Sequence, residues 1–317
     1  MSSYVQSRRF WLRLVQSGVS LSLIAWLLAR VSWRDVLALM AQADVWLMVA
    51  ACALYYLGVA LSCVKWAIAL RVESVNLPLL RLFRWYLIGA FVNNFFPTDV
   101  GGDLGRGFYA GRFSGRLGAV TRSIIVERLT GLVAMLVLAI FGMVVVIRQI
   151  QVEISAIAAG LGLLFIAALL VGRTRVQAHP WSVAAMDKLR MSWERYRSRP
   201  IEVLAMLALS LAFQTLAGTG VWLNMHAVGV DLPLVVIVPA TALVGVVGLL
   251  PLSINGWGVR ESLIVGLLAP LGALPDQLLA GALLGRVLLL LVTLAGGVLL
   301  LTEKPTMRSG TEKDVAV

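Results

Sequence analysis

Six apolar runs, each about the length of a bilayer-crossing helix, constrain the fold of this chain more than any other feature. A transmembrane helix needs about 20 predominantly apolar residues. Hydrophobic residues make up 60% of the chain and charged residues only 14%, whereas about a quarter of a soluble protein is charged. The sequence therefore predicts an all-α polytopic membrane protein. The expected spans are Leu12–Ala29, Val45–Leu70, Ala119–Ile147, Ile154–Gly172, Ile201–Met225 and Leu278–Leu301.

The basic residues lie mainly between these runs and indicate the topology. The net charge of +11 does not indicate a nucleic-acid partner, because cytoplasmic loops of membrane proteins are enriched in Lys and Arg. The N-terminus and the segments 71–84, 106–116 and 173–199 are basic, so we expect them in the cytoplasm together with the C-terminus. Lys65, near the end of the second run, is placed to extend its ammonium group to the membrane surface.

This topology predicts two re-entrant helical hairpins. If Arg84 and Arg112 are both cytoplasmic, the segment Leu82–Tyr109 must enter and leave the membrane on one face. The linker around Asp231 has no basic residue and is expected outside, so Leu234–Leu271 becomes a second hairpin that enters from the opposite face. The alternative is that each limb crosses the membrane fully, which would give more spans.

A repeated motif lies near the tip of each expected hairpin. Pro97 is followed by Gly102 after five residues and Arg106 after nine, and Pro251 is followed by Gly256 and Arg260 at the same spacings. Paired Pro/Gly interruptions in the two halves of a membrane protein are typical of transporters with inverted repeats and a site near the midplane.

The expected organisation is one transmembrane domain, residues 1–303, followed by a disordered cytoplasmic tail, 304–317. Repeat one covers about 45–147 and repeat two about 201–301, with a cytoplasmic loop, 173–200, between them.

The residues of the motifs suit an anionic headgroup. A broken helix exposes backbone N–H groups, glycines allow a bound group to approach them closely, and arginines match the geometry of phosphate. The asparagines can instead satisfy backbone groups freed at the breaks. The candidate substrate-binding residues are Arg106, Arg128, Arg260, Arg286, Gly101, Gly102, Gly256, Gly258, Asn94 and Asn255.

Charges inside the apolar runs leave two interpretations open. A buried arginine costs at least about 2.5 kcal/mol, so Arg128 and Arg286 need partners. The four arginines could converge on a headgroup, or Arg128 and Arg286 could pair with acids that hold the hairpins. The acidic candidates, as ion-pair partners or as a proton relay, are Asp99, Asp103, Glu127 and Glu261.

The sequence contains no Ser/His/Asp arrangement, no metal-ligand spacing and no Walker A motif. We therefore expect no cofactor and no bound metal, and a transporter rather than an enzyme.

Three groups of these residues carry a resemblance to a known family. The chain resembles the transmembrane region of lysylphosphatidylglycerol synthases, also called the flippase-like domain family, over roughly Arg8 to Leu301. The motifs are Asn94-Phe95-Phe96-Pro97 leading to Gly101-Gly102 and Arg106, Val126-Glu127-Arg128, and Leu250-Pro251 leading to Gly256-Trp257-Gly258-Val259-Arg260-Glu261.

The resemblance implies a multi-pass protein of the bacterial inner membrane that moves an anionic phospholipid or lipid-linked headgroup between leaflets. In bifunctional relatives an attached soluble synthase makes the lipid. This chain ends soon after its last apolar run, so we expect no lysyltransferase activity from it. A membrane-embedded enzyme or accessory subunit of a hopanoid or glycolipid pathway, working with lipid-biosynthesis enzymes, is the alternative. The sequence leaves the lipid, the direction and energy source of transport, and the oligomeric state open.

Overall fold

The computed structural model confirms the predicted all-α class. It describes residues 32–96, 100–149, 193–249 and 257–303, and within these ranges it contains helices and no strand. The helices are α2 (Trp33–Ala41), α3 (Val45–Val72), α4 (Leu79–Asn93), α5 (Val100–Ser114), α6 (Leu117–Gln149), α9 (Pro200–Ala227), α10 (Leu234–Gly248), α11 (Val259–Leu268), the 3-10 turn η2 (Ala269–Leu271) and α12 (Pro275–Thr302).

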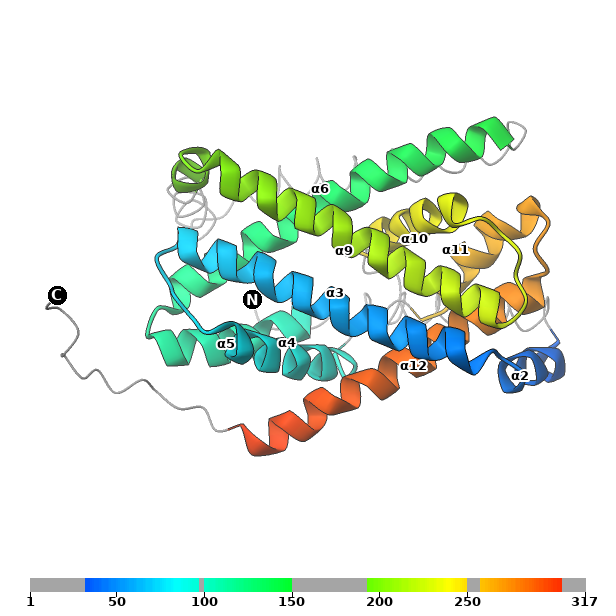
Figure 1. Ribbon diagram of the computed structural model, residues 1–317, viewed down its shortest axis with the longest axis horizontal. Helices are drawn as coiled ribbons and strands as arrows, with labels where there is room; N and C mark the ends of the chain where they lie inside the picture. Colours follow the sequence, from blue (N-terminus) through cyan, green and yellow to red (C-terminus); the bar gives the residue numbers. More distant parts are fainter. Residues whose placement is uncertain (1–31, 97–99, 150–192, 250–256, 304–317) are drawn as a thin grey trace, which may run out of the picture.

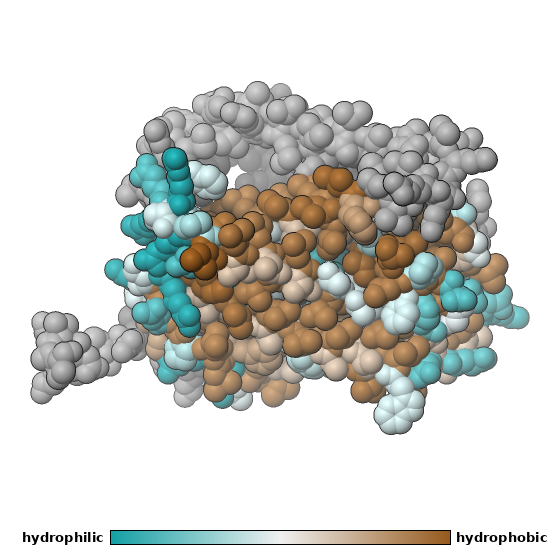
Figure 2. All heavy atoms as spheres, turned by 45° about the horizontal axis from the view of Figure 1, so that its top comes forward, coloured by the Kyte–Doolittle hydropathy of each residue, from teal (hydrophilic) through white to brown (hydrophobic). Residues whose placement is uncertain are grey.

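Four helices are long and apolar enough to cross a membrane. They are α3, α9 and α12, each of 28 residues, and the Leu117–Gly142 part of α6. These four match predicted spans, and the other two predicted spans, 12–29 and 154–172, lie outside the described residues. Figure 2 shows a band of apolar side chains across the middle of the molecule, with hydrophilic residues toward both ends.

The remaining helices between the long ones are too short to cross by themselves. The 15 residues of α4 and of α5 extend about 22 Å at 1.5 Å per residue, less than the roughly 30 Å of a hydrocarbon core. The two helices pack against each other, and Arg81 near the start of α4 stacks on Phe113 near the end of α5 at 4.1 Å. The first residues of α4 and the last residues of α5 therefore lie at the same end of the molecule (Figure 1).

The second half repeats this order of elements. A 28-residue helix, α9, is followed by the 15-residue α10, the 10-residue α11 and the long α12. The helices α10 and α11 pack against each other. Val236, near the start of α10, belongs to the same apolar cluster as Leu268, at the end of α11. The order of long, short, short and long helices thus occurs twice.

The turn after the first helix of each half is also repeated. Ser74 and Gly229 both have positive φ, 61° and 86°, and the next residue in each turn donates its N–H back to the helix, at 2.8 Å for Val75 and 3.0 Å for Val230. This is the Schellman ending of a helix. The sequences Asn76-Leu77-Pro78-Leu79 and Asp231-Leu232-Pro233-Leu234 follow the two turns, and in both the proline is the N-cap of the next helix.

The two halves pack on each other reciprocally. α3 lies along α9, α4 of the first half packs on α12 of the second, and α10 of the second half packs on α6 of the first (Figure 1). Glycines permit both of the crossed contacts. Gly142 of α6 faces Pro239 of α10, and Gly296 of α12 faces the carbonyl of Leu87 in α4. A Cβ at either glycine would collide with the partner helix.

One end of the molecule is strongly basic and is held together by Glu73. This carboxylate is fully buried and accepts hydrogen bonds from Arg122 at 2.7 Å and Arg195 at 3.1 Å. Beside it, the Tyr196 hydroxyl donates to the Ala69 carbonyl at 3.1 Å. Burial, reinforced by the Glu73 charge, raises the pKa of Tyr196, so this phenol remains a donor. These contacts join α3, α6 and the segment that precedes α9.

Candidate functional site

The tip of the α4–α5 pair is a close helix crossing. A Cβ at Gly89 would lie 2.6 Å from the carbonyl oxygen of Gly102, and a Cβ at Gly102 would lie as close to the carbonyl of Gly89. The Asn93 side chain accepts a hydrogen bond from the Gly102 N–H at 3.1 Å. Asn94 donates to Thr293 of α12 at 2.8 Å. Asn93 thus satisfies a backbone group near the break, while Asn94 connects the tip to the other half.

Arg106 of α5 lies behind this tip in a cage of aromatic and acidic side chains. Its guanidinium stacks on Trp66 and Tyr86, 4.6 Å and 4.5 Å from the ring centroids. It donates to one oxygen of Asp103 at 3.0 Å and 2.8 Å, and its Nη1 lies 2.7 Å from Glu127 Oε2. Only 4% of the side chain is exposed. Ionic, hydrogen-bonding and cation–π contacts together compensate for the burial of this charge.

Lys65 joins the same cage, which corrects the expectation that it reaches the membrane surface. The residue is 6% exposed, and its ammonium lies 3.9 Å from Glu127 Oε1 and 3.3 Å from the Ser210 hydroxyl. The turn at the end of α3 lies beyond it, and the carboxylate of α6 offers a closer partner than water. Lys65 therefore connects α3, α6 and α9 inside the bundle.

Arg128 is the most exposed arginine beside the Arg106 cage. Its Nε donates to Asp103 Oδ2 at 2.5 Å, and 45% of its side chain is exposed. Asp103 consequently bridges a buried arginine, Arg106, and a half-exposed one, Arg128. We refer to Lys65, Asp103, Arg106, Glu127 and Arg128 as the Arg106 cluster.

A smaller ionic group lies at the start of α11. One oxygen of Glu261 accepts the N–H of Gly258 at 2.8 Å, which caps the helix, and the other accepts Arg286 Nε at 2.8 Å. The Arg286 guanidinium stacks on Trp257 at 4.6 Å. Gly258 has φ of 80°, a conformation that favours glycine.

Arg260 lies against the last turn of α10. A Cβ at Gly248 would be 3.1 Å from its Nε, so the glycine makes room for the guanidinium. Arg106 and Arg128 share the carboxylate of Asp103, whereas Arg286 pairs with Glu261. The convergence of the four arginines on one headgroup stays a prediction.

Each of the two ionic groups contains an ion pair that corresponds to one in the other group. Asp103 of α5 pairs with Arg128 of α6, and Glu261 of α11 pairs with Arg286 of α12. In both, the acid precedes the arginine by 25 residues and accepts from its Nε. Each pair fastens the second short helix of a half to the long helix that follows it.

Three predicted site residues, Asp99, Asn255 and Gly256, lie outside the described residues. Gly101 is described and is buried, and a Cβ there would collide with the ring of Phe96. Its small size is therefore required for packing at the tip. Among the described residues, no three His, Cys, Asp or Glu side chains gather as a metal site requires.

The comparison with known protein families fits this arrangement of helices and charges. The family model described as the lysylphosphatidylglycerol synthase TM region matches residues 13–297, which include both ionic groups. The chain belongs to this family. No curated protein matched the chain. Family membership and the four long apolar helices identify a multi-pass membrane protein with a function related to membrane lipids.

The roles of four side chains in this site were not predicted from the sequence. Trp66, Tyr86 and Ser210 lie in or beside apolar runs, and their roles follow from helix packing. Lys65 carried a signal, because it lies a full two turns before the end of α3, deep within an apolar run. Such a position favours an internal partner over the surface.

Proposed function

We propose that this protein is a lipid translocase that moves an anionic phospholipid or lipid-linked headgroup between the leaflets of the bacterial inner membrane. The observation that carries this proposal is the bridging position of Asp103 between buried Arg106 and half-exposed Arg128. In a membrane protein of a lipid-related family, such a pair offers a phosphate a cationic contact at the edge of a buried ionic network.

The proposed binding step is an exchange of anions on Arg128. A phosphate oxygen replaces Asp103 on this guanidinium, while Asp103 keeps its two hydrogen bonds to Arg106. Arg106 also keeps Glu127, so the buried arginine keeps both of its counter-charges during the exchange. The exchange is therefore far less costly than opening a fully buried pair. The acyl chains remain in the bilayer throughout.

We further infer that the two halves form an inverted repeat and that each pair of short helices is re-entrant. The repeated helix order, the repeated Schellman turn, the reciprocal packing and the two ion pairs at a spacing of 25 residues support this inference. Repeats of this kind rock against each other around a site between them. Arg260 and Arg286 would then serve the headgroup from the opposite face.

The proposed orientation places the basic end in the cytoplasm, with both termini. Arg71, Arg84, Arg112 and Arg116 lie at this end. At the other end, Asp44 precedes α3, Asp231 follows α9 and Asp276 lies in the first turn of α12. Positive residues near the ends of membrane helices favour the cytoplasmic side.

Leaflet exchange in liposomes tests the proposed function. The purified protein is reconstituted with a fluorescent phosphatidylglycerol, and dithionite quenching reports the outer-leaflet fraction over time. Wild-type protein should accelerate exchange over protein-free liposomes, and Arg128→Gln should slow it at least tenfold. A hydrogen bond to a charged group contributes about 1.5–3 kcal/mol, and each 1.4 kcal/mol corresponds to about a factor of ten.

Arg112→Gln is the matched control, because it removes an exposed arginine from α5 outside the Arg106 cluster. Its exchange rate should stay within about twofold of wild type. Equal rates for wild type, Arg128→Gln and protein-free liposomes would refute the translocase.

A further inference from the structure

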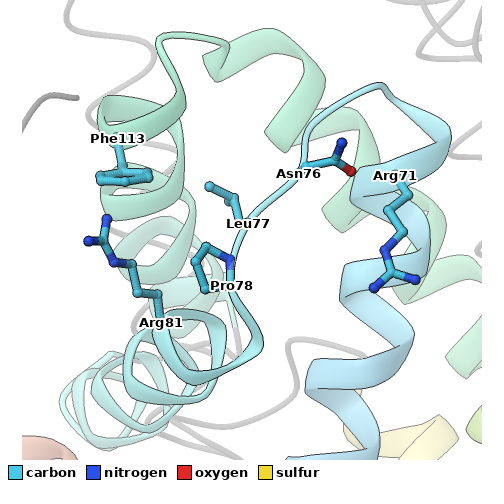
Figure 3. A pocket seen from close by; sticks show the side chains of 6 residues that line it. All are labelled: Arg71, Asn76, Leu77, Pro78, Arg81 and Phe113. Carbon is cyan, nitrogen blue, oxygen red and sulfur yellow. The ribbon is translucent and has the colours of Figure 1, made fainter. Parts of the chain in front are cut away.

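A separate cleft lies at the basic end, away from the Arg106 cluster. It has a volume of about 610 Å³, within the range of about 300–1,000 Å³ that is usual for small-molecule sites. Figure 3 shows Arg81 and Phe113 on one side, Arg71 and Asn76 on the other, and the turn to α4 between them. The lining residues are Arg71, Asn76, Leu77, Pro78, Arg81 and Phe113.

The two arginines of the cleft retain their capacity to bind an anion. Among the described residues, neither Arg71 nor Arg81 has a carboxylate partner. Glu73, close to Arg71 in sequence, is buried and bound to Arg122 and Arg195. The stacking of Arg81 on Phe113 at 4.1 Å fixes the plane of its guanidinium while leaving its N–H edge available. The cleft therefore combines two cations, an amide and an apolar wall.

The equivalent turn in the second half lacks this charge, although its backbone is the same. There Asp231 stands in place of Asn76, and Val236, two residues after the Leu-Pro-Leu segment, stands in place of Arg81. The residue before the turn is His226 in place of Arg71, and its ring contacts Trp222. A Schellman turn alone thus does not require the arginines. A general preference for cytoplasmic positive charge would be met by Arg84 and Arg112 outside the cleft.

From this asymmetry we propose that the cleft binds the phosphate group of a membrane lipid at the basic face, before the headgroup reaches the Arg106 cluster. Arg71 and Arg81 contact the phosphate oxygens, Asn76 donates to the headgroup, and Phe113 and Leu77 contact its carbon skeleton. The order of binding rests on the proposed translocase function, whereas phosphate binding in the cleft does not. Because the corresponding turn of the second half carries Asp231 and no arginine, the protein would load anionic lipid from one leaflet.

Binding of short-chain lipid to the detergent-purified full chain tests this proposal. Dihexanoyl-phosphatidylglycerol and sn-glycerol 3-phosphate are titrated separately, and affinity is measured by microscale thermophoresis. The double variant Arg71→Gln/Arg81→Gln should weaken lipid binding at least tenfold. Arg84→Gln/Arg112→Gln removes the same charge from the same end outside the cleft and should change the affinity less than twofold.

Asn76→Asp provides a second variant that leaves both arginines in place. It introduces the acid that the second turn carries at Asp231, so it should also weaken lipid binding at least tenfold. Equal affinity for the cleft variants and the control pair would overturn the site. Binding of sn-glycerol 3-phosphate as tight as that of the lipid would overturn the assignment to a lipid headgroup.

The same variants separate this site from the translocase proposal. Arg128→Gln should slow leaflet exchange, whereas Arg71→Gln/Arg81→Gln should weaken the binding of short-chain lipid. If wild-type protein accelerates no exchange but its lipid binding still depends on Arg71 and Arg81, the translocase is refuted and the cleft stands. If exchange depends on Arg128 but the double cleft variant binds lipid normally, the cleft is refuted and the translocase stands.

Discussion

At the scale of single residues, Arg106 shows how a permanent charge is accommodated inside a membrane protein. Trp66, Tyr86, Asp103 and Glu127 approach the guanidinium from α3, α4, α5 and α6, so one side chain connects four helices. A planar guanidinium can stack on two rings and still donate at its edge, which an ammonium group cannot do. The cage therefore depends on arginine at this position.

Glu127 is the carboxylate that both buried cations, Lys65 and Arg106, share. The effects of changing Glu127 and Lys65 on stability should therefore not be additive. Glu127→Gln should lower the free energy of unfolding by about 3 kcal/mol, because it leaves buried charge uncompensated. Lys65→Met combined with Glu127→Gln should cost at least about 1 kcal/mol less than the sum of the single changes. Unfolding by SDS in mixed micelles measures all three.

The exposed pair of Arg199 and Glu202, 4.0 Å apart, supplies the control. Glu202→Gln should change the free energy of unfolding by less than about 1 kcal/mol. Strict additivity of Lys65→Met and Glu127→Gln would contradict the shared role of Glu127.

At the scale of elements, glycines decide how the short helices fit. Gly89 and Gly102 allow α4 and α5 to cross, while Gly142 and Gly296 admit α10 and α4 against the long helices of the opposite half. Small residues at helix contacts let backbones approach closely in membranes. Each of the two crossed contacts between the halves thus depends on a glycine of the long helix.

Gly142→Ala and Gly296→Ala should each destabilise the protein. The added methyl collides with Pro239 or with the Leu87 carbonyl, and overpacking of this kind costs about 1–3 kcal/mol. Gly220→Ala in α9 is the control, because its Cβ would meet nothing within 4 Å. Thermal unfolding of the purified variants ranks them. A Gly296→Ala protein as stable as Gly220→Ala would show that α12 does not depend on this close contact with α4.

At the scale of the whole molecule, charge is segregated along the direction of the long helices. Arg122 and Arg195 bind Glu73 at one end, where Arg116 also donates to the Ser74 carbonyl, and the turn around Asp231 follows α9 at the other end. An apolar band lies between these ends (Figure 2). In the proposed re-entrant arrangement, this segregation sets the face from which each pair of short helices enters.

Cysteine labelling in intact cells tests that orientation. In a background without Cys52 and Cys63, Asn76→Cys and Arg112→Cys precede and follow the tip of the α4–α5 pair, and Asp231→Cys lies at the opposite end. A membrane-impermeant maleimide should label position 231 in intact cells and positions 76 and 112 only after permeabilisation. Labelling of 76 and 112 from opposite sides would mean that α4 and α5 cross the membrane fully.

Apolar run length predicted the positions of α3, α6, α9 and α12 to within a few residues, because a bilayer-spanning helix needs a fixed minimum of apolar length. Local patterns also indicated Glu261 as a partner of Arg286, one of the alternatives left open. The position of Lys65 was predicted wrongly, because its partners Glu127 and Ser210 come from helices distant in the chain.

The sequence by itself determined the class of the protein, its four described spans and the two interrupted motifs, because hydropathy and backbone breaks are local properties. Only the tertiary structure decided which charges meet. Helix packing brought Arg106 to Glu127 and Arg286 to Glu261, and left Arg71 and Arg81 facing an open cleft. A side chain's partner depends on which helix faces lie together, and that is set by glycine contacts and aromatic packing between segments far apart in the chain.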